Sequence, residues 1–341
     1  MGEALVHNAG NAATGGIWRL RESGRTQILK VARPPSEEPR GRPAWQTSDE
    51  PTHWNYWRRE TLAYTTGLAT TVYADAGIVA PDLIRVLERS DGSVALWLAD
   101  ATGTPGTRWS VDRLAHFARQ LGHAQAEWAE RVPDLPWLSR RWLAQYLAGR
   151  DVWVADNIDW DHPAAAVWPE AVRRILARMM PERQTLLERA EASPRTLCHL
   201  DVWPMNLIEA GEQTVLLDWS FVGEGGIGED PANLIVDSVA DGLIDAALLP
   251  EINERVTDSY LDGLREGGFT GSPDQVRGAI AAAAAAKYAW FGAGVLGRVL
   301  RDGNFGHPEY GQHASGAEAL ESLRGLVTLL AGWASREIRS A

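Results

Sequence analysis

Apolar and polar residues alternate through much of the first hundred positions, a pattern that predicts β-strands. Residues 17–22 and 26–32 are two alternating runs joined by a short turn that contains glycine, so they predict an antiparallel hairpin. Residues 83–87 and 94–98 repeat the pattern around a Ser-Asp-Gly turn and predict two more strands. A small antiparallel sheet is therefore expected in this part of the chain.

The spacing of apolar residues becomes helical beyond this region. Ser110 is a good N-cap for a helix whose apolar positions continue at helical intervals to Trp128. Another helix is expected over residues 164–192, and the last hundred residues or so are mostly helical. A short buried strand, residues 214–217, interrupts the helical region.

The segment 101–106 breaks both patterns, because it contains only Ala, Thr, Gly and Pro. It is the expected boundary between an N-lobe, residues 1–100, and a C-lobe, residues 101–341. The N-lobe should also hold one helix, at about residues 54–67, after an exposed loop at 34–51. A chain of 341 residues suits two lobes. The predicted fold class is α+β, with a small antiparallel β N-lobe and a larger, mainly helical C-lobe.

The charge of the chain limits its partners. The net charge is −12, which argues against nucleic acid, because binding to that backbone needs clustered Lys and Arg. The excess of acidic residues could attract a cationic substrate, but solubility or a compositional bias is the preferred explanation. The sixteen tryptophans are spread along the sequence, so most are expected in the core or between the lobes.

Cysteine content and hydropathy favour a cytoplasmic protein. Cys198 is the only cysteine, which rules out an internal disulfide framework and fits a reducing compartment. Residues 1–16 lack the layout of a signal peptide. The alanine-rich run 279–286 is followed by Lys287, so a buried helix is expected there rather than a membrane span.

A short polar segment carries the candidate chemistry. His199, Asp201 and Asn206 lie in the sequence His-Leu-Asp-Val-Trp-Pro-Met-Asn, where the proline predicts a loop. Asp218 follows the buried strand 214–217. Asn206 and Asp218 are oxygen ligands that suit Mg²⁺, which needs few protein side chains when substrate phosphates complete its shell. Asp201 then remains as a separate carboxylate.

The order of these residues resembles the aminoglycoside phosphotransferase family, within the wider protein-kinase-like fold. That family carries His-Gly-Asp-x₄-Asn, then an apolar strand and an Asp. The resemblance implies that Asp201 orients the acceptor hydroxyl and takes its proton, and that His199 braces the loop. Asn206 and Asp218 would hold Mg²⁺ on the phosphates of the nucleotide.

The resemblance extends into the N-lobe, which it implies is the nucleotide-binding lobe. Lys30, in Ile-Leu-Lys-Val, matches the strand lysine that contacts the α- and β-phosphates. Glu60, in Trp-Arg-Arg-Glu, matches the helix glutamate that pairs with that lysine. The remaining contacts to the nucleotide are assigned to the small-residue loop and to the hinge: Gly10, Gly15, Gly16, Trp97 and Leu98.

The sequence departs from the family pattern at two positions. Leu200 stands where the family has glycine, which matters little if its side chain points into the core. In the family, the segment beyond the metal-binding Asp often ends in Asp-Leu-Ala, which acts as a secondary anchor. Asn233 is assigned to that position in this sequence, so the anchor is expected to be altered. Nearby acids either bind a substrate amine or cap and solvate helices; they are Glu224, Glu229, Asp230, Asp237 and Asp241.

The predicted function is Mg²⁺-dependent transfer of the γ-phosphate of ATP or GTP to a hydroxyl of a small molecule. An antibiotic or aminosugar is the leading acceptor. A metabolic kinase for a sugar or amino alcohol would use the same catalytic residues. A nucleotide-binding pseudokinase is the alternative of another class. The protein is expected to be a monomer or homodimer.

Overall fold

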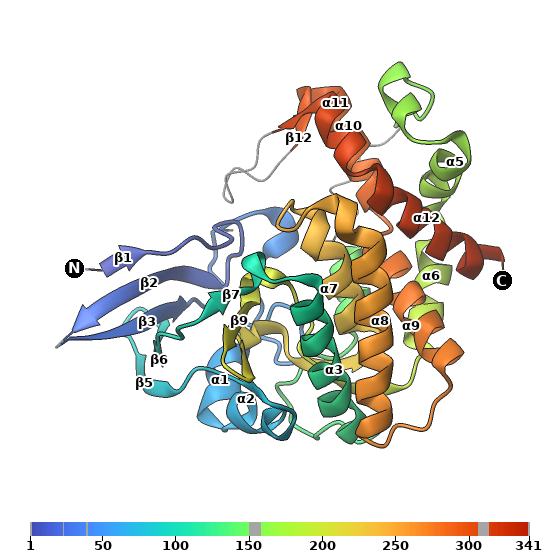
Figure 1. Cartoon of the computed structure of the whole chain (residues 1–341). Helices are drawn as coiled ribbons and strands as arrows, with labels where there is room; N and C mark the ends of the chain where they lie inside the picture. Colours follow the sequence, from blue (N-terminus) through green and yellow to red (C-terminus); the bar gives the residue numbers. More distant parts are fainter. Residues whose placement is uncertain (1, 23, 39, 150–157, 306–313, 340–341) are drawn as a thin grey trace.

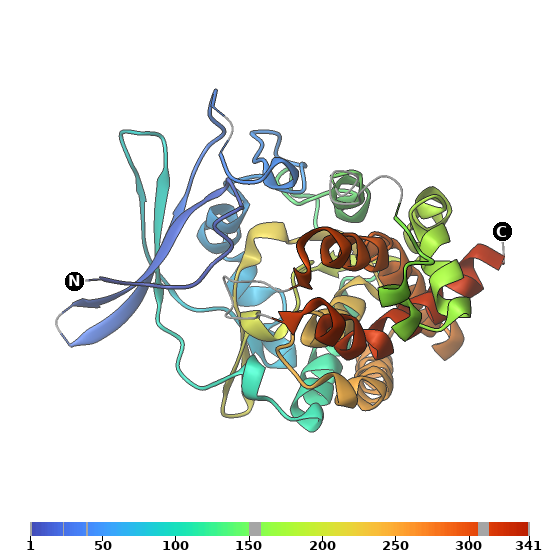
Figure 2. The same cartoon turned by 90° about the horizontal axis from the view of Figure 1, so that it is seen from above.

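A computed structural model describes residues 2–22, 24–38, 40–149, 158–305 and 314–339. The strand-rich N-terminal part lies on one side, and the helices gather on the other (Figure 1). Seen from above, the segment around residues 200–226 lies between these two parts (Figure 2). The predicted α+β fold class is therefore confirmed.

The N-terminal part is a five-stranded antiparallel sheet in the order β1-β2-β3-β6-β5. Its strands are β1 (Gly2–Ala4), β2 (Thr14–Glu22), β3 (Arg25–Ala32), β5 (Leu83–Glu88) and β6 (Val94–Ala99). The predicted hairpin and the later strand pair are both confirmed. In the register of the sheet, Lys30 of β3 lies between Ile17 of β2 and Leu96 of β6.

The helix predicted from residue 54 begins later, as α1 (Arg59–Thr65), and is followed by α2 (Leu68–Thr71). The physical reason is the Arg59 guanidinium, which is fully buried. It donates hydrogen bonds to the carbonyl oxygens of Pro51, His53 and Trp54, at 2.9, 2.5 and 2.9 Å. Those carbonyls therefore turn towards Arg59, and the residues before it form turns.

A second sheet joins residues from both sides of position 100. Its order is β4-β10-β9-β7, and β4 pairs in parallel with β10. Its strands are β4 (Ile78–Val79), β7 (Thr104–Pro105), β9 (Leu207–Ala210) and β10 (Gln213–Leu216). Strands β8 (Arg195–Cys198) and β11 (Gly223–Gly226) pair as a two-stranded antiparallel ribbon. Residues 199–222 lie between these two strands in the sequence. These strands hold both ends of the predicted catalytic loop.

The predicted helix after Ser110 is confirmed as α3 (Val111–Glu127), and the Ser110 hydroxyl accepts a hydrogen bond from the Arg113 N–H as its N-cap. Helix α3 packs along α8 (Leu249–Glu266), side by side in Figure 1. Glycine permits this approach: a Cβ atom on Gly263 would lie 2.0 Å from the carbonyl oxygen of Arg119.

The single helix predicted over 164–192 is wrong, because the segment forms two helices, α5 (Glu170–Met179) and α6 (Arg183–Glu191), separated around Pro181. The other helices of this part are α4 (Trp142–Ala148), α7 (Glu229–Ala240), α9 (Pro273–Lys287), α10 (Phe291–Asp302), α11 (Gly316–Ser322) and α12 (Arg324–Arg339), with a small β12 (Asn304–Phe305) and β13 (Ala314–Ser315) pair.

The alanine-rich run is buried in α9, as predicted, where it packs against α6, α7 and α12. Within the described residues, one stretch, 273–302, is long and apolar enough to cross a membrane. The fold itself buries 89% of the most apolar window of that stretch. The small alanine side chains let three helices pack closely around α9.

Candidate active site

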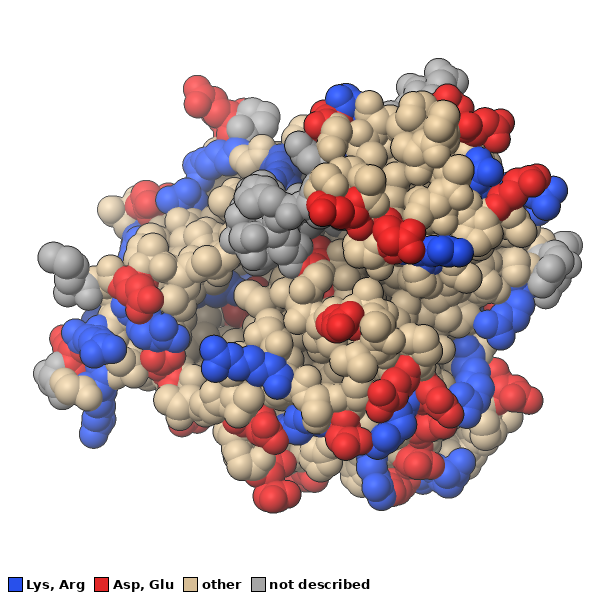
Figure 3. Space-filling view, turned by 45° about the horizontal axis from the view of Figure 1, so that its top comes forward, with Lys and Arg blue, Asp and Glu red and all other residues tan. Residues whose placement is uncertain are grey.

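A cavity of about 610 Å³ lies between the N-terminal sheet and the helical part. Its wall includes residues from β2, β3, α1 and the end of β6, and from α7, α9 and α10. The space-filling view shows a hollow between the two parts, with uncharged atoms over much of its surroundings (Figure 3). The segment 201–221 supplies the wall at the middle of the cavity.

An ion-pair cluster forms one end of the cavity. The Lys30 Nζ lies 2.6 Å from a Glu60 carboxylate oxygen and 2.7 Å from the Asp218 Oδ1. Burial by itself would lower the pKa of Lys30, but the Asp218 and Glu60 carboxylates outweigh it and raise the pKa above its ordinary value. Lys30 is therefore a fixed cation, and it joins the N-terminal sheet to the segment after β10.

Asp218 directs its carboxylate into the cavity from a left-handed backbone conformation, with φ of +58°. The Oδ1 atom accepts from both the Lys30 ammonium and the Ser220 hydroxyl. Asp218 and its neighbour Asn206 are connected through the backbone, because the Leu217 N–H donates to the Asn206 carbonyl at 2.9 Å. The loop before β9 and the residue after β10 are thereby held together.

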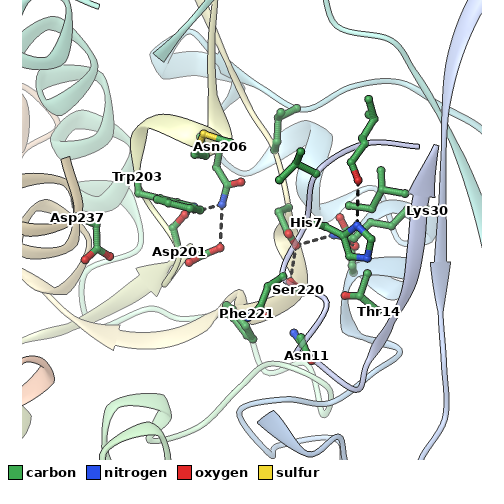
Figure 4. Close-up of a pocket in the computed structure, with 18 of the residues that line it drawn as sticks. His7, Asn11, Thr14, Lys30, Asp201, Trp203, Asn206, Ser220, Phe221 and Asp237 are labelled. Carbon is green, nitrogen blue, oxygen red and sulfur yellow. Dashed lines mark hydrogen bonds and ion pairs between the residues drawn. The ribbon is translucent and has the colours of Figure 1, made fainter. Parts of the chain in front are cut away.

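Asp201 and Asn206 face the same cavity (Figure 4). The Asn206 amide nitrogen donates to the Asp201 carbonyl oxygen at 2.9 Å and to its Oδ2 at 2.8 Å. Burial, and then the charge of Asp218, raise the pKa of Asp201 to about 7. A carboxylate with such a pKa can accept a proton from a substrate near neutral pH.

The oxygen atoms of Asn206 and Asp218 fit a hard cation. The Asn206 side chain bonds to Asp201 through its nitrogen, which directs its oxygen elsewhere. Asp218 contacts Lys30 and Ser220 through Oδ1, so its Oδ2 can face a cation. Among the described residues, no group of three or more His, Cys, Asp or Glu could hold a metal. The arrangement therefore suits Mg²⁺ that keeps phosphate and water ligands, rather than a site made by protein alone.

His199 is fully buried and is not among the residues that line the cavity. Its ring lies edge-on to the Trp219 indole, with 5.1 Å between the ring centroids. Burial lowers the pKa of His199, so the ring is neutral at pH 7. The position suits a brace between the loop and the Asp218 segment, and it keeps His199 away from any substrate.

The anchor of the loop is Asp230, at the start of α7, rather than a residue at position 233. The fully buried Asp230 carboxylate accepts hydrogen bonds from the His199 and Leu200 N–H groups at 2.9 and 2.7 Å, and from the Gln125 amide at 2.7 Å. The expectation of an altered anchor at Asn233 is therefore wrong. Asn233 instead bonds to the Val202 carbonyl at 2.8 Å.

Leu200 occupies a backbone conformation that favours glycine, with φ of +68°. Leu200 is 2% exposed and belongs to the hydrophobic core, so its side chain points inward, which was the condition for tolerating leucine at this position. The left-handed conformation costs about 1–2 kcal/mol for a residue with a Cβ atom. The two hydrogen bonds to Asp230 and the burial of the leucine offset this cost.

The other acidic residues fall into two groups. Glu224 pairs with Arg140 and Arg195, and Glu229 accepts a hydrogen bond from the Gly226 N–H at 2.6 Å. These two therefore stabilise the β8–β11 region. Asp237 and Asp241, by contrast, line the cavity. Figure 4 shows Asp237 on the side of Asp201 that is away from Lys30.

The structure places only part of the predicted nucleotide contacts at the cavity. Leu98 lines it, whereas the Trp97 ring lies against the Arg85 guanidinium, 4.5 Å from the ring centroid. Gly10, Gly15 and Gly16 are not among its lining residues. Residues of the same loop that do line it are Asn8, Asn11 and Thr14.

Sequence reasoning missed most of the cavity wall around Asp201. This wall is aromatic, and its residues come from α4, from the turn between α9 and α10, from the start of α10 and from other loops. Six of them are Trp142, Tyr146, Trp203, Phe221, Tyr288 and Trp290. They share no motif, and no spacing in the sequence distinguishes them from core aromatics.

Comparison with known proteins extends only as far as the fold. No known family profile matches this sequence, and no curated protein matches it significantly. Amicoumacin kinase hAmiN, solved with AMP-PNP, Ca²⁺ and Ami, is 12% identical; the match covers 94% of this chain and 88% of that chain, with a TM-score of 0.54. An aminoglycoside phosphotransferase from Alicyclobacillus acidocaldarius subsp. acidocaldarius DSM 446 is 15% identical, over 97% and 90%, with a TM-score of 0.51. This chain therefore has the fold of these kinases.

Proposed function

We propose that this chain belongs to the aminoglycoside phosphotransferase family and transfers the γ-phosphate of ATP to a hydroxyl of a small molecule. One observation carries the proposal: Lys30, paired with Glu60 and Asp218, shares a single cavity with Asp201. Phosphoryl transfer uses a fixed cation to bind the phosphates and a carboxylate to orient the acceptor hydroxyl.

The proposed mechanism assigns a separate task to each residue. Lys30 binds the α- and β-phosphates, and Glu60 keeps its ammonium in place. Asp201 accepts a hydrogen bond from the acceptor hydroxyl, orients its oxygen towards the γ-phosphorus, and takes its proton as the new P–O bond forms and the bond to the ADP oxygen breaks. The fixed arrangement lowers the barrier because little reorganisation is needed.

Asn206 and Asp218 would hold Mg²⁺ through their side-chain oxygens. When bound, the ion supplies positive charge to the phosphate oxygens as negative charge develops on them. Asp218 serves a second purpose, because its Oδ1 also holds Lys30. The loss of Asp218 should therefore affect nucleotide binding more than the loss of Asn206.

The identities of donor and acceptor are supported by the fold neighbours. The amicoumacin kinase structure contains AMP-PNP, which supports ATP over GTP as donor. One neighbour is named as a kinase of amicoumacin and the other as an aminoglycoside phosphotransferase, which supports an antibiotic or aminosugar as acceptor and a role in resistance. A metabolic kinase for a sugar or amino alcohol remains the second candidate. A cytoplasmic location and a monomeric or homodimeric state stay predictions.

A Mg²⁺–ATP consumption screen tests the proposal. The acceptors are aminoglycosides, peptide and nucleoside antibiotics, aminosugars and amino alcohols. Asp201→Asn should lose nearly all turnover of the best acceptor and still bind nucleotide, because the proposed mechanism assigns the phosphates to Lys30 and the bound metal rather than to Asp201. Glu224→Gln, a change in an ion pair outside the cavity, should keep turnover. Wild-type turnover in Asp201→Asn would refute the assignment, and nucleotide binding without turnover of any acceptor would favour a pseudokinase.

A further inference from the structure

Arg59, at the start of α1, is a fully buried cation, and no Asp or Glu among the described residues pairs with it. Its guanidinium uses all five of its N–H groups, and each of them donates to a backbone carbonyl oxygen. Burial lowers the pKa of Arg59 to about 9, so the group remains charged at pH 7. A buried charge is costly, and an apolar side chain would fill the same space at lower cost. The directed hydrogen bonds are therefore what distinguishes Arg59 at this position.

The five carbonyl oxygens belong to three separate segments of the chain. Three of them lie in the turns that precede α1, within residues 51–54. The Arg59 Nε donates to the Trp137 carbonyl at 2.9 Å, in the loop between α3 and α4. One terminal nitrogen donates to the Ser220 carbonyl at 3.1 Å, close after Asp218 in the sequence. One side chain thus joins the start of α1 to the helical part and to the segment that carries Asp218.

These segments also bond to one another, so they form one junction. The Ser139 hydroxyl donates to the Phe221 carbonyl at 2.8 Å, and the Arg140 N–H donates to the Thr52 carbonyl at 3.2 Å. Helix α1 packs against the 3-10 turn Trp219–Phe221. Helix α1 is therefore attached to the helical part, although it lies in the sequence between strands of the N-terminal sheet.

A closed ring of contacts connects α1 with Asp218 by two routes. Glu60 reaches Asp218 through Lys30, at 2.6 and 2.7 Å. Arg59 reaches it through Ser220, whose carbonyl accepts from the guanidinium and whose hydroxyl donates to the carboxylate. Nucleotide phosphates would compete with Asp218 for Lys30, whereas no ligand in the proposed mechanism competes for Arg59, which does not line the cavity. The second route therefore holds when the first is exchanged for nucleotide contacts.

Given the proposed phosphotransferase function, on which this step rests, we infer that Arg59 is a positioning residue. It holds α1, and with it Glu60 and Lys30, in the arrangement that binds nucleotide before any nucleotide is present. In protein kinases the corresponding lysine–glutamate pair is put in place by movement of its helix and by phosphorylation. The junction at Arg59 replaces such a control, so this chain needs neither modification nor a partner to assemble its site.

Hydrogen exchange of the wild-type protein tests whether α1 is held in advance. The exchange of the α1 amides is measured by mass spectrometry without ligand and with saturating Mg²⁺ and AMP-PNP. Helix α8 is the internal reference, because none of its residues lines the cavity and it reports only the general stabilisation that a bound ligand gives. We expect α1 to slow no more than about threefold beyond α8. A larger slowing would overturn the inference, because it would show that nucleotide, rather than Arg59, fixes α1.

A double-mutant cycle tests whether Arg59 acts through Glu60. Calorimetry with Mg²⁺ and AMP-PNP compares Arg59→Met, Glu60→Gln and the double variant. Each single change should weaken binding about tenfold, and the double variant no more than about twentyfold, because the two changes break the same ring. Unchanged binding in Arg59→Met, or the full product of about a hundredfold in the double variant, would overturn the inference.

Leu326→Ala is the matched control for lost stability. Leu326 is fully buried in α12, which contributes no residue to the cavity. This variant should lower the urea midpoint and bind AMP-PNP within about twofold of the wild-type protein. Equal weakening of binding in Leu326→Ala and Arg59→Met would reduce Arg59 to a contributor to general stability and overturn its positioning role. If Arg59→Met does not fold, hydrogen exchange of the wild-type protein still decides.

Phosphoryl transfer separates this inference from the proposed function. Asp201-dependent turnover, together with wild-type nucleotide binding in Arg59→Met, would leave the proposed reaction intact and overturn the positioning role. The expected coupling between Arg59 and Glu60, without transfer to any screened acceptor, would support the positioning role and count against the kinase assignment.

Discussion

Asp230→Asn is expected to loosen the loop that carries Asp201. The Asp230 carboxylate accepts three hydrogen bonds, at 2.9, 2.7 and 2.7 Å, in a fully buried position. An asparagine amide has one acceptor oxygen, and its NH₂ group would face a donor, so at least one buried donor loses its partner. Each such loss costs about 1–3 kcal/mol, and the remaining bonds lose their charge assistance. We expect the free energy of unfolding to fall by about 2–4 kcal/mol.

Urea denaturation followed by tryptophan fluorescence measures this effect, alongside turnover with the best acceptor. The measurements belong at about pH 8, because burial raises the pKa of Asp230 to about 6 and the carboxylate must be charged. Glu224→Gln is the matched control, because its ion pairs with Arg140 and Arg195 are partly exposed and contribute at most about 1 kcal/mol. If both variants lost the same small stability and kept turnover, the bonds of Asp230 would not be what holds the loop.

Three further predictions concern the loop and the cavity. Asp218→Ala should abolish Mg²⁺-dependent nucleotide binding, since it removes a metal-facing oxygen and the Lys30 contact; calorimetry showing unchanged Mg²⁺ dependence would contradict this. Leu200→Ala should be less stable than Leu200→Gly: both lose a buried side chain, at about 2–5 kcal/mol, but only glycine removes the left-handed penalty of about 1–2 kcal/mol. The opposite order of urea midpoints would show that Leu200 is not strained. Burial and then the charge of Asp218 raise the pKa of Asp201 to about 7, so its carboxylate becomes charged as the pH rises through 7. The kcat/KM for the best acceptor should therefore rise up to about tenfold between pH 6 and 8, and a flat profile would refute a role for Asp201 as the base.

Local patterns were sufficient for much of the fold. The hairpin around Gly24, the turn at Gly92 and the Ser110 cap depend on residues that are neighbours in the chain, so the sequence predicts them well. The start of helix α1 and the division of residues 164–192 into two helices were harder to predict from the sequence. The start of α1 depends on carbonyl contacts of the buried Arg59, and no local pattern reveals that guanidinium.

By itself, the sequence determined the order of Lys30, Glu60, Asp201, Asn206 and Asp218, and hence the kinase-like chemistry that their resemblance to a known family implies. Their types and spacing are properties of the chain. Only the tertiary structure decided which acid holds the loop and what surrounds the acceptor. The hydrogen bonds to buried Asp230 and the aromatic wall of the cavity both depend on packing. Packing brings together residues that are far apart in the sequence, and no sequence pattern predicts which of them will meet.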